Sequence, residues 1–393
     1  MSQHRPTVFP SIQDKLNQAL EAATQFPEVR EELQAQGIEP AYGEGFTLMR
    51  SGLRLGISRD FLAEDGSSAM DPQALASLHS IAGIEIEMLE QPAQAPITRA
   101  DLYRYDALMI KRNPVDAALF GAPAAGTLRL RLLARNGVGF DHIAVDACTA
   151  AGVMVCTTPD AVARPVASSI MAMMLAFSHR LLPRDRATRQ GRWSERWNQA
   201  GLALTGRTLG VVGLGNIGLE LLRLALPWEM RHLGTTPRVD MARYAGLRVE
   251  PVALDVLLTT SDFVAMCCPL NESTRGLIDA RALARMQPQA VLINTARGEV
   301  VDEPALVDAL RNGRIAGAGI DVFAQEPPAG DNPLFGLDNV ILGSHNLAYS
   351  DELNSKANRA CAAAIGMLAA NRPAPHLVNP RVLAHPRLAE LLS

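Results

Sequence analysis

A glycine-rich turn between an apolar segment and a helical one constrains the fold of this chain most strongly. Residues 208–225 read TLGVVGLGNIGLELLRLA, a buried-strand pattern followed by Gly-x-Gly-x-x-Gly and a helical pattern. The first glycine permits a tight turn, the second lets the backbone approach a pyrophosphate, and the third allows close helix–strand packing. The phosphates of such a ligand rest on the N–H groups of the helix N-terminus. The predicted dinucleotide contacts in this segment are Gly213, Gly215, Asn216, Ile217 and Gly218.

Strand-like and helix-like patterns alternate along both halves of the chain. In the first half, apolar segments typical of strands are separated by helical stretches such as 72–82 and 141–151. Because alternating strands and helices form parallel sheets, both halves are expected to fold as α/β units. Strands are predicted at residues 53–58, 84–89, 106–112 and 128–139, and in the second half near 208–212, 231–235, 263–266, 290–294, 316–320 and 340–342.

Two helical segments lie outside this alternation. Residues 160–182 predict one long helix, whose methionines are more typical of a core or a subunit contact than of a cofactor site. Residues 11–36 contain helix formers at roughly helical spacing and are followed by Gly37, which predicts a helical N-terminal extension.

Composition excludes several classes of protein. The 41 acidic and 37 basic residues leave a net charge of −4 without a basic block, so nucleic acid is not an expected partner. Five scattered cysteines without Cys-x-x-Cys spacing disfavour disulfide and zinc frameworks, and no metal site is expected. The first residues lack a signal-peptide pattern, and the longest apolar stretch, 166–177, is shorter than the roughly 20 residues that cross a bilayer. We therefore expect a soluble, cytoplasmic protein without a membrane partner.

Polar side chains follow three of the strands predicted in the second half. Arg297 follows the first of these strands, in the segment AVLINTARGEVVDE at 290–303. Glu326 comes soon after the second, AGAGIDVF, and His345 ends the third segment, VILGSH. Ligands of open α/β sheets bind at the carboxyl ends of the strands. Hydride transfer to a keto acid needs a cation that binds the carboxylate and a group that donates a proton. Arg297, Glu326 and His345 are therefore the predicted catalytic set.

The end of the second strand of the dinucleotide unit bears on the choice of cofactor. An acidic residue about 20 residues after the glycines would bind the ribose hydroxyls of NAD, but residues 234–238 read Gly-Thr-Thr-Pro-Arg. Without a carboxylate, and with Arg238 close enough to pair with a 2′-phosphate, NADP is slightly favoured over NAD. Alternatively, Arg238 is a solvated loop residue and NAD binds through hydroxyls.

Several motifs in order resemble the D-isomer-specific 2-hydroxyacid dehydrogenase family. They span residues 53–350 and read NGVGFDHI, VMVCTTP, GLGNIG, CCPLNESTRGLI, NTARGEVVDE, GIDVFAQEPP and GSHNLA. The resemblance implies a homodimer and a flavodoxin-like substrate domain, built from both ends of the chain, with a Rossmann domain inserted in it. The implied division is an extension at 1–50, a substrate domain at 51–158 and 346–393, and a Rossmann domain at 159–345.

The resemblance also implies roles for individual residues. Arg297 would bind the substrate carboxylate and keto oxygen, His345 would be the acid–base group, and Glu326 would hold that imidazole. The backbone N–H groups of Val138 and Gly139 would form a cradle for the carboxylate. The other residues expected to face the cofactor are Thr236, Arg238, Cys267, Pro269, Thr295, Ala296 and Asp321.

The chain departs from the family pattern close to the predicted site. Thr236 stands where an acid would bind the ribose, and Cys267 stands where many members have histidine. After the predicted catalytic histidine, Asn346, Leu347 and Tyr349 replace small residues, which suggests a reshaped substrate pocket.

The leading hypothesis is an NAD(P)-dependent enzyme that interconverts a 2-oxo acid and its D-2-hydroxy acid. Glyoxylate, hydroxypyruvate or a bulkier 2-oxo acid would be its substrate. Phosphite oxidation on the same scaffold is one alternative, and a dinucleotide-sensing protein similar to the C-terminal-binding-protein corepressors is another. Lys111 and Arg112, which follow a predicted strand, either reach the substrate or form a salt-bridged rim.

Overall fold

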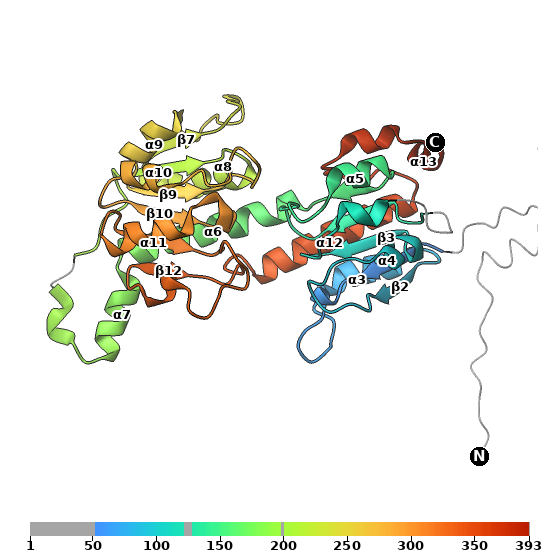
Figure 1. The fold of residues 1–393 in the computed structure, drawn as a ribbon, viewed down its shortest axis with the longest axis horizontal. Helices are drawn as coiled ribbons and strands as arrows, with labels where there is room; N and C mark the ends of the chain where they lie inside the picture. Colours follow the sequence, from blue (N-terminus) through green and yellow to red (C-terminus); the bar gives the residue numbers. More distant parts are fainter. Residues whose placement is uncertain (1–51, 122–127, 198–199, 393) are drawn as a thin grey trace, which may run out of the picture. The chain divides into compact units, whose positions relative to one another are not determined.

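The computed structural model describes residues 52–121, 128–197 and 200–392, whose elements are drawn in Figure 1. The helix expected within residues 11–36 lies outside the described residues. Two parallel sheets organise the described chain, one in each region where strand and helix patterns alternate. The α/β class predicted from the sequence is thereby confirmed.

The first sheet contains five parallel strands in the order β2-β1-β3-β4-β5. This is the strand order of flavodoxin-like folds, as expected for the substrate domain. The carboxyl ends of β3 and β4 are neighbours, with Ile110 opposite Arg135. The strands are β1 (Arg54–Ile57), β2 (Glu85–Met88), β3 (Ala107–Ile110), β4 (Leu132–Arg135) and β5 (Met154–Cys156).

A helix from the C-terminal part of the chain packs on the first sheet. Helix α12 (Asp351–Ala369), orange-red in Figure 1, buries Ile365 and Leu368 in the same core as Leu55 of β1. The domain boundaries at residues 158 and 346 stay predictions. The other elements of this region are α3 (Pro72–His79), α4 (Arg99–Arg104), α5 (Val145–Ala150), α13 (Pro386–Leu392), and the 3₁₀ helices η1 (Arg59–Phe61), η2 (Ala117–Phe120) and η7 (Pro380–Ala384).

The second sheet contains seven parallel strands in the order β12-β11-β10-β9-β6-β7-β8. Counted from β6, this is the Rossmann order 3-2-1-4-5-6 with one more strand at the end. The order reverses between β6 and β9, and dinucleotides bind at the carboxyl ends of the strands at such a point. The strands are β6 (Thr208–Val212), β7 (Arg231–Thr235), β8 (Val249–Pro251), β9 (Phe263–Met266), β10 (Val291–Asn294), β11 (Gly317–Ile320) and β12 (Val340–Leu342).

Helix α6 (Pro159–Ser178) belongs to the core of the second sheet. Met173 and Met174 are buried, and a Cβ built on Gly319 of β11 would lie 2.6 Å from Met173 Sδ. The methionines of α6 are therefore core residues, as the sequence predicts. Among the described residues, α6 alone is long and apolar enough to cross a membrane, yet 56% of its apolar window is buried inside the protein, as expected of a core helix.

The remaining helices connect the strands of the second sheet or follow α6. They are α7 (Leu181–Arg189), α8 (Asn216–Ala225), α9 (Leu254–Thr260), α10 (Ala280–Arg285) and α11 (Glu303–Arg311), with the 3₁₀ helices η3 (Trp193–Trp197), η4 (Leu226–Trp228), η5 (Gly298–Val300) and η6 (Pro333–Gly336).

Some elements differ from the sequence-based expectations. Strands β5 and β8 are three residues each, too short to produce a readable pattern, and were not predicted. The helix expected over 160–182 ends at Ser178, because Arg180 takes a left-handed backbone with φ of 49° and starts α7. The strand expected over 128–139 is limited to β4, and the chain turns at Gly137 with φ of 129°.

Candidate active site

The glycines after β6 form the tight turn that the sequence predicts. Gly213 has a φ of 103°, and a Cβ there would lie 2.7 Å from the carbonyl carbon of Cys267. A Cβ on Gly218 would lie 2.2 Å from the carbonyl oxygen of Gly213, so only glycine permits this approach of helix and turn. Gly215 faces open space, and no side chain caps the N-terminus of α8. The turn therefore leaves room and unpaired helix N–H groups, which fits a pyrophosphate.

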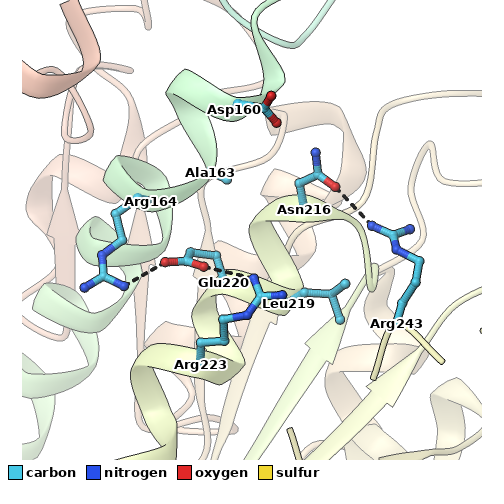
Figure 2. A pocket seen from close by; sticks show the side chains of 8 residues that line it. All are labelled: Asp160, Ala163, Arg164, Asn216, Leu219, Glu220, Arg223 and Arg243. Carbon is cyan, nitrogen blue, oxygen red and sulfur yellow. Dashed lines mark hydrogen bonds and ion pairs between the residues drawn. The ribbon is translucent and has the colours of Figure 1, made fainter. Parts of the chain in front are cut away.

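A cavity of about 470 Å³ lies beside this turn. Figure 2 shows that Arg164 of α6 and Arg223 of α8 both pair with Glu220, at 2.7 and 3.0 Å. Arg243 approaches the same cavity from the chain after β7 and donates to Asn216 Oδ1 at 3.0 Å. Asn216 is the first residue of α8, so Arg243 lies next to the helix N-terminus where a phosphate would bind.

Arg238, predicted to bind the cofactor, does not line this cavity. The lining includes Arg243 but not Arg238, which is exposed and whose carbonyl accepts the Tyr244 hydroxyl at 3.3 Å. Thr236, at the end of β7, is partly buried. Sequence reasoning missed Arg243 because its position depends on how the loop after β7 returns to α8.

Residues after β9 and β10 line the same edge of the sheet. The N–H of Cys267 donates to Val212 at 2.8 Å, and burial raises the pKa of its thiol. Pro269 is exposed. Buried Asn294 accepts from the N–H of Ala296 at 3.0 Å and donates to the carbonyl of Arg297 at 2.8 Å, which fixes the segment that contains Thr295. These residues lie at the carboxyl ends of the strands, as the sequence predicts.

Glu326 and His345 are in direct contact. Nδ1 of His345 lies 2.8 and 2.9 Å from the two carboxylate oxygens of Glu326, which also accept from the N–H of Phe323 at 3.1 Å and from Arg112. Burial alone would raise the pKa of Glu326, but the hydrogen bonds from His345 and Arg112 hold it at about 2. The carboxylate is therefore ionised at neutral pH and orients the imidazole, leaving Nε2 free to move a proton.

Arg297 is held at the end of β10 by contacts on both sides. Its Nε and Nη2 lie 2.9 Å from Oδ1 of Asp141, and its Nη1 donates to the carbonyl of Ala296 at 2.7 Å. Burial would raise the pKa of Asp141, but the hydrogen bond and charge of Arg297 lower it. The guanidinium packs against Gly139, and among the described residues no protein acceptor binds the N–H of Val138 or Gly139. Arg297 thus lies beside the predicted carboxylate cradle.

The sequence of this chain matches a known family of dehydrogenases. Residues 171–346 match the family model described as the NAD-binding domain of D-isomer-specific 2-hydroxyacid dehydrogenases. A glyoxylate reductase of Korarchaeum cryptofilum is 39% identical over 71% of this chain and 84% of its own length. The chain belongs to this dehydrogenase family. Residues 171–346 are accordingly part of a Rossmann domain that binds a nicotinamide dinucleotide, and the protein is an oxidoreductase.

Two further relatives place this dehydrogenase within its family. A D-3-phosphoglycerate dehydrogenase of Archaeoglobus fulgidus is 33% identical over 76% of this chain, and the match spans only 55% of that longer protein. The crystal structure of an NADPH-dependent glyoxylate/hydroxypyruvate reductase from Sinorhizobium meliloti, with NADP and malonate, has a TM-score of 0.70 at 28% identity and covers 84% of this chain and 98% of that one. Both results agree with the family that the motifs indicate.

Asp321 has a structural role that the family resemblance does not imply. Its carboxylate accepts the N–H of Leu347 at 3.3 Å, and burial raises its pKa. It thereby supports the loop after β12 that carries His345. The contact expected between Asp321 and the cofactor stays a prediction.

Other residues of this dehydrogenase site were missed from the sequence or left open. Arg112, whose role was open, pairs with Glu326, whereas Lys111 donates to the carbonyl of Asp60 at 2.9 Å. Arg135 and Asp141 were not singled out, although both lie in or beside the NGVGFDHI motif. The available signal was that Arg135 ends a strand and Asp141 follows it. Among the described residues, no group of three or more His, Cys, Asp or Glu side chains could hold a metal ion.

Proposed function

We propose that the protein reduces a small 2-oxo acid to the corresponding D-2-hydroxy acid. The observation that carries this proposal is the contact of His345 Nδ1 with Glu326 at 2.8 Å, at the same sheet edge as Arg297. An imidazole oriented by an ionised carboxylate suits a group that gives a proton to a developing alkoxide and takes it back in the reverse direction. The match of residues 171–346 to the family model and the names of the relatives support this reaction class.

Each residue of the proposed site has one task. Arg297 and the N–H groups of Val138 and Gly139 bind the substrate carboxylate, because preorganised donors suit an anion. His345 moves the proton at the keto oxygen through Nε2, and Glu326 keeps its ring in place through Nδ1. The bound dinucleotide would supply or accept the hydride at substrate C2. The glycines after β6 and the N-terminus of α8 would hold its pyrophosphate.

We further propose that NADPH is preferred over NADH. Residues 234–238 contain no carboxylate that would repel a 2′-phosphate, and Arg243, in the chain that follows this segment, lines the cavity beside the glycine turn. A guanidinium binds phosphate oxygens in a bidentate manner. The reductase of Sinorhizobium meliloti, described as NADPH-dependent, supports the same choice. Arg238, favoured from the sequence for this task, is the second candidate.

The proposed function is tested by oxidation of NADPH and NADH with purified protein. Glyoxylate and hydroxypyruvate are tried first, because relatives carry these names, followed by pyruvate, phenylpyruvate and 2-oxoisocaproate. His345→Ala should lower turnover roughly 10²–10⁴-fold, as expected when a general acid–base group is removed. His79→Ala, at the exposed end of α3, is the matched control. Undiminished turnover in His345→Ala would contradict the assignment.

The same assay separates the alternatives. Oxidation of phosphite with reduction of the dinucleotide, and no turnover of any 2-oxo acid, would favour a phosphite-type dehydrogenase. Dinucleotide-dependent association without turnover on any of these compounds would favour a sensor similar to the corepressors.

We infer that the working form is a cytoplasmic homodimer. Exposed apolar side chains gather on α7 and η3, where Leu181, Trp193 and Trp197 are 57%, 64% and 80% exposed. A second copy of the chain would cover them, since large exposed apolar patches mark interaction sites. The five cysteines are free thiols, which agrees with a reducing compartment. Light scattering of the purified protein tests the dimer, with Trp193→Ser/Trp197→Ser expected to weaken it.

A further inference from the structure

A second cavity, of about 190 Å³, lies at the carboxyl ends of β3 and β4. Arg112 follows β3, Arg135 ends β4, and Arg297 reaches the cavity from the segment after β10 of the other sheet. Asp141 and Glu326 also line it. Ligands of open parallel sheets bind at this edge, so three guanidinium groups converge where a substrate is expected.

The cations of this cavity differ in how they are neutralised. Arg297 pairs with Asp141 at 2.9 Å, and Arg112 pairs with Glu326. Arg135 donates to the carbonyl of the adjacent Asn136, but its buried Nε has no hydrogen-bond partner, and no carboxylate pairs with it among the described residues. A partly buried guanidinium without a counter-charge is unfavourable unless an anion binds to it.

The pKa shifts of the cavity residues agree with a charge on Arg135 that no carboxylate neutralises. Burial, and then repulsion by Arg297, lower the pKa of Arg135 to about 10, so the side chain still carries its charge at neutral pH. Burial, and then the charge of Arg135, lower the pKa of His142 to about 4. The remaining acid of the lining, Glu299, lies 3.7 Å from exposed Arg275. The field in the cavity is therefore positive around Arg135.

Two glycines of one turn bring the arginines together. A Cβ on Gly137 would lie 1.3 Å from Nη1 of Arg135, and a Cβ on Gly139 would lie 1.5 Å from Nη2 of Arg297. Both guanidinium groups thus pack on the backbone of the NGVG segment, two residues apart. An anion bound by Arg135 would lie close to one bound by Arg297.

We propose that Arg135, assisted by Arg112, binds a second anionic group of the substrate. The substrate is then a 2-oxo acid with a further carboxylate or phosphate, rather than a monoanion such as glyoxylate. This inference rests on the proposed function, in which Arg297 binds the carboxylate next to the keto group. Charge-assisted hydrogen bonds to Arg135 would give the dianion its advantage.

The first experiment compares substrates that differ in the second anion. Oxaloacetate is compared with 2-oxobutyrate for the carboxylate, and 3-phosphohydroxypyruvate with hydroxypyruvate for the phosphate. We expect kcat/KM to be about ten- to a hundredfold higher for the dianion in at least one pair, as one or two hydrogen bonds to a charged group provide. The pair with the larger ratio identifies the second group. Ratios near or below one in both pairs would overturn the proposal.

The second experiment removes the charge of Arg135. Arg135→Gln should lower the dianion-to-monoanion ratio of kcat/KM by about tenfold or more, and Arg135→Lys should restore part of it. Arg311→Gln, which removes an exposed charge at the end of α11, should leave the ratio unchanged. Equal losses for both members of a pair in Arg135→Gln would show a purely structural role and would contradict the subsite.

A binding measurement separates failure of the subsite from failure of the proposed reaction. Calorimetric titration of the NADPH-loaded protein with D-malate and D-lactate, and with D-3-phosphoglycerate and D-glycerate, needs no turnover. We expect tighter binding of the dianion in at least one pair, and loss of that difference in Arg135→Gln. This result without any reduction of 2-oxo acids would uphold the subsite and reject the reaction. Turnover without a dianion preference in titration would reject the subsite alone.

Discussion

The main-chain N–H of His345 donates to the carbonyl oxygen of Asp321 at 2.7 Å. This bond joins the residue after β11 to a residue three positions beyond the end of β12, where the histidine backbone has a left-handed φ of 55°. Such a backbone is unusual for a residue other than glycine and persists where the surroundings fix it. The position of the imidazole therefore depends on Asp321 as well as on Glu326.

Gly343→Ala tests this dependence. A Cβ at Gly343 would lie 2.1 Å from Oδ1 of Asp321 and would displace the carboxylate that supports the loop. We expect kcat for 2-oxo acids to fall by roughly 10²-fold, since a misplacement of about 1 Å has that effect on catalysis. Gly336→Ala is the control, because nothing lies within 4 Å of its Cβ. Equal kinetics of the two variants would show that Asp321 does not position the histidine.

Arg243→Gln and Arg238→Gln test the assignment of the phosphate contact. Arg243 lies 3.0 Å from Asn216 at the N-terminus of α8, whereas Arg238 is exposed. We expect Arg243→Gln to weaken NADPH binding about tenfold, the effect of one lost charge-assisted hydrogen bond, and Arg238→Gln to have a smaller effect. Calorimetric titration with NADPH and NADH measures both. A selective loss of NADPH affinity in Arg238→Gln alone would restore the assignment made from the sequence.

The ion pairs of Glu326 predict how stability depends on pH. Its pKa in the folded protein is about 2, against an ordinary value of 4.5. A carboxyl whose pKa is lowered by folding stabilises the protein fully above its ordinary pKa, and this contribution is lost as the pH falls towards the folded value. The difference in unfolding free energy between the wild type and Glu326→Gln should therefore shrink between pH 4.5 and pH 2. Urea unfolding at pH 6, 4 and 3 measures it, and a constant difference would contradict the prediction.

Neighbouring residues of α12 test its packing on the first sheet. Ile365 is fully buried, so Ile365→Ala should lower the free energy of unfolding by about 2–5 kcal/mol. Gly366 has open space around its Cβ position within the same helix, so Gly366→Ala should raise the free energy of unfolding by up to about 1 kcal/mol. Denaturant unfolding compares the two. Similar small effects would show that α12 does not contribute to that core.

The parts of the fold that could be predicted are those with a local signal. The Gly-x-Gly-x-x-Gly turn, the alternation of strands and helices and the motif order together gave the correct fold class and family. Arg297, Glu326 and His345 could be singled out because each lies just beyond an apolar strand pattern. Their convergence then follows from parallel pairing, which aligns the carboxyl ends of neighbouring strands.

The parts that could not be predicted depend on contacts between distant segments. The pair of Arg112 with Glu326 joins residues 214 positions apart, and that of Arg297 with Asp141 joins residues 156 apart. Neither ion pair produces a periodic pattern in the sequence. Strands β5 and β8 take their structure from their neighbours, since three residues are too few for a propensity signal. The choice between Arg238 and Arg243 depends on the path of one loop.

The division of the site between two sheets has an evolutionary consequence. The residues proposed to recognise the second anion lie at or just after the ends of β3 and β4, whereas those proposed to hold the dinucleotide follow β6 and β7. Mutations in one set leave the strand ends of the other set intact. The preference for a substrate acid and the preference for a coenzyme can therefore evolve separately. A lineage can come to use a new acid and keep the same coenzyme.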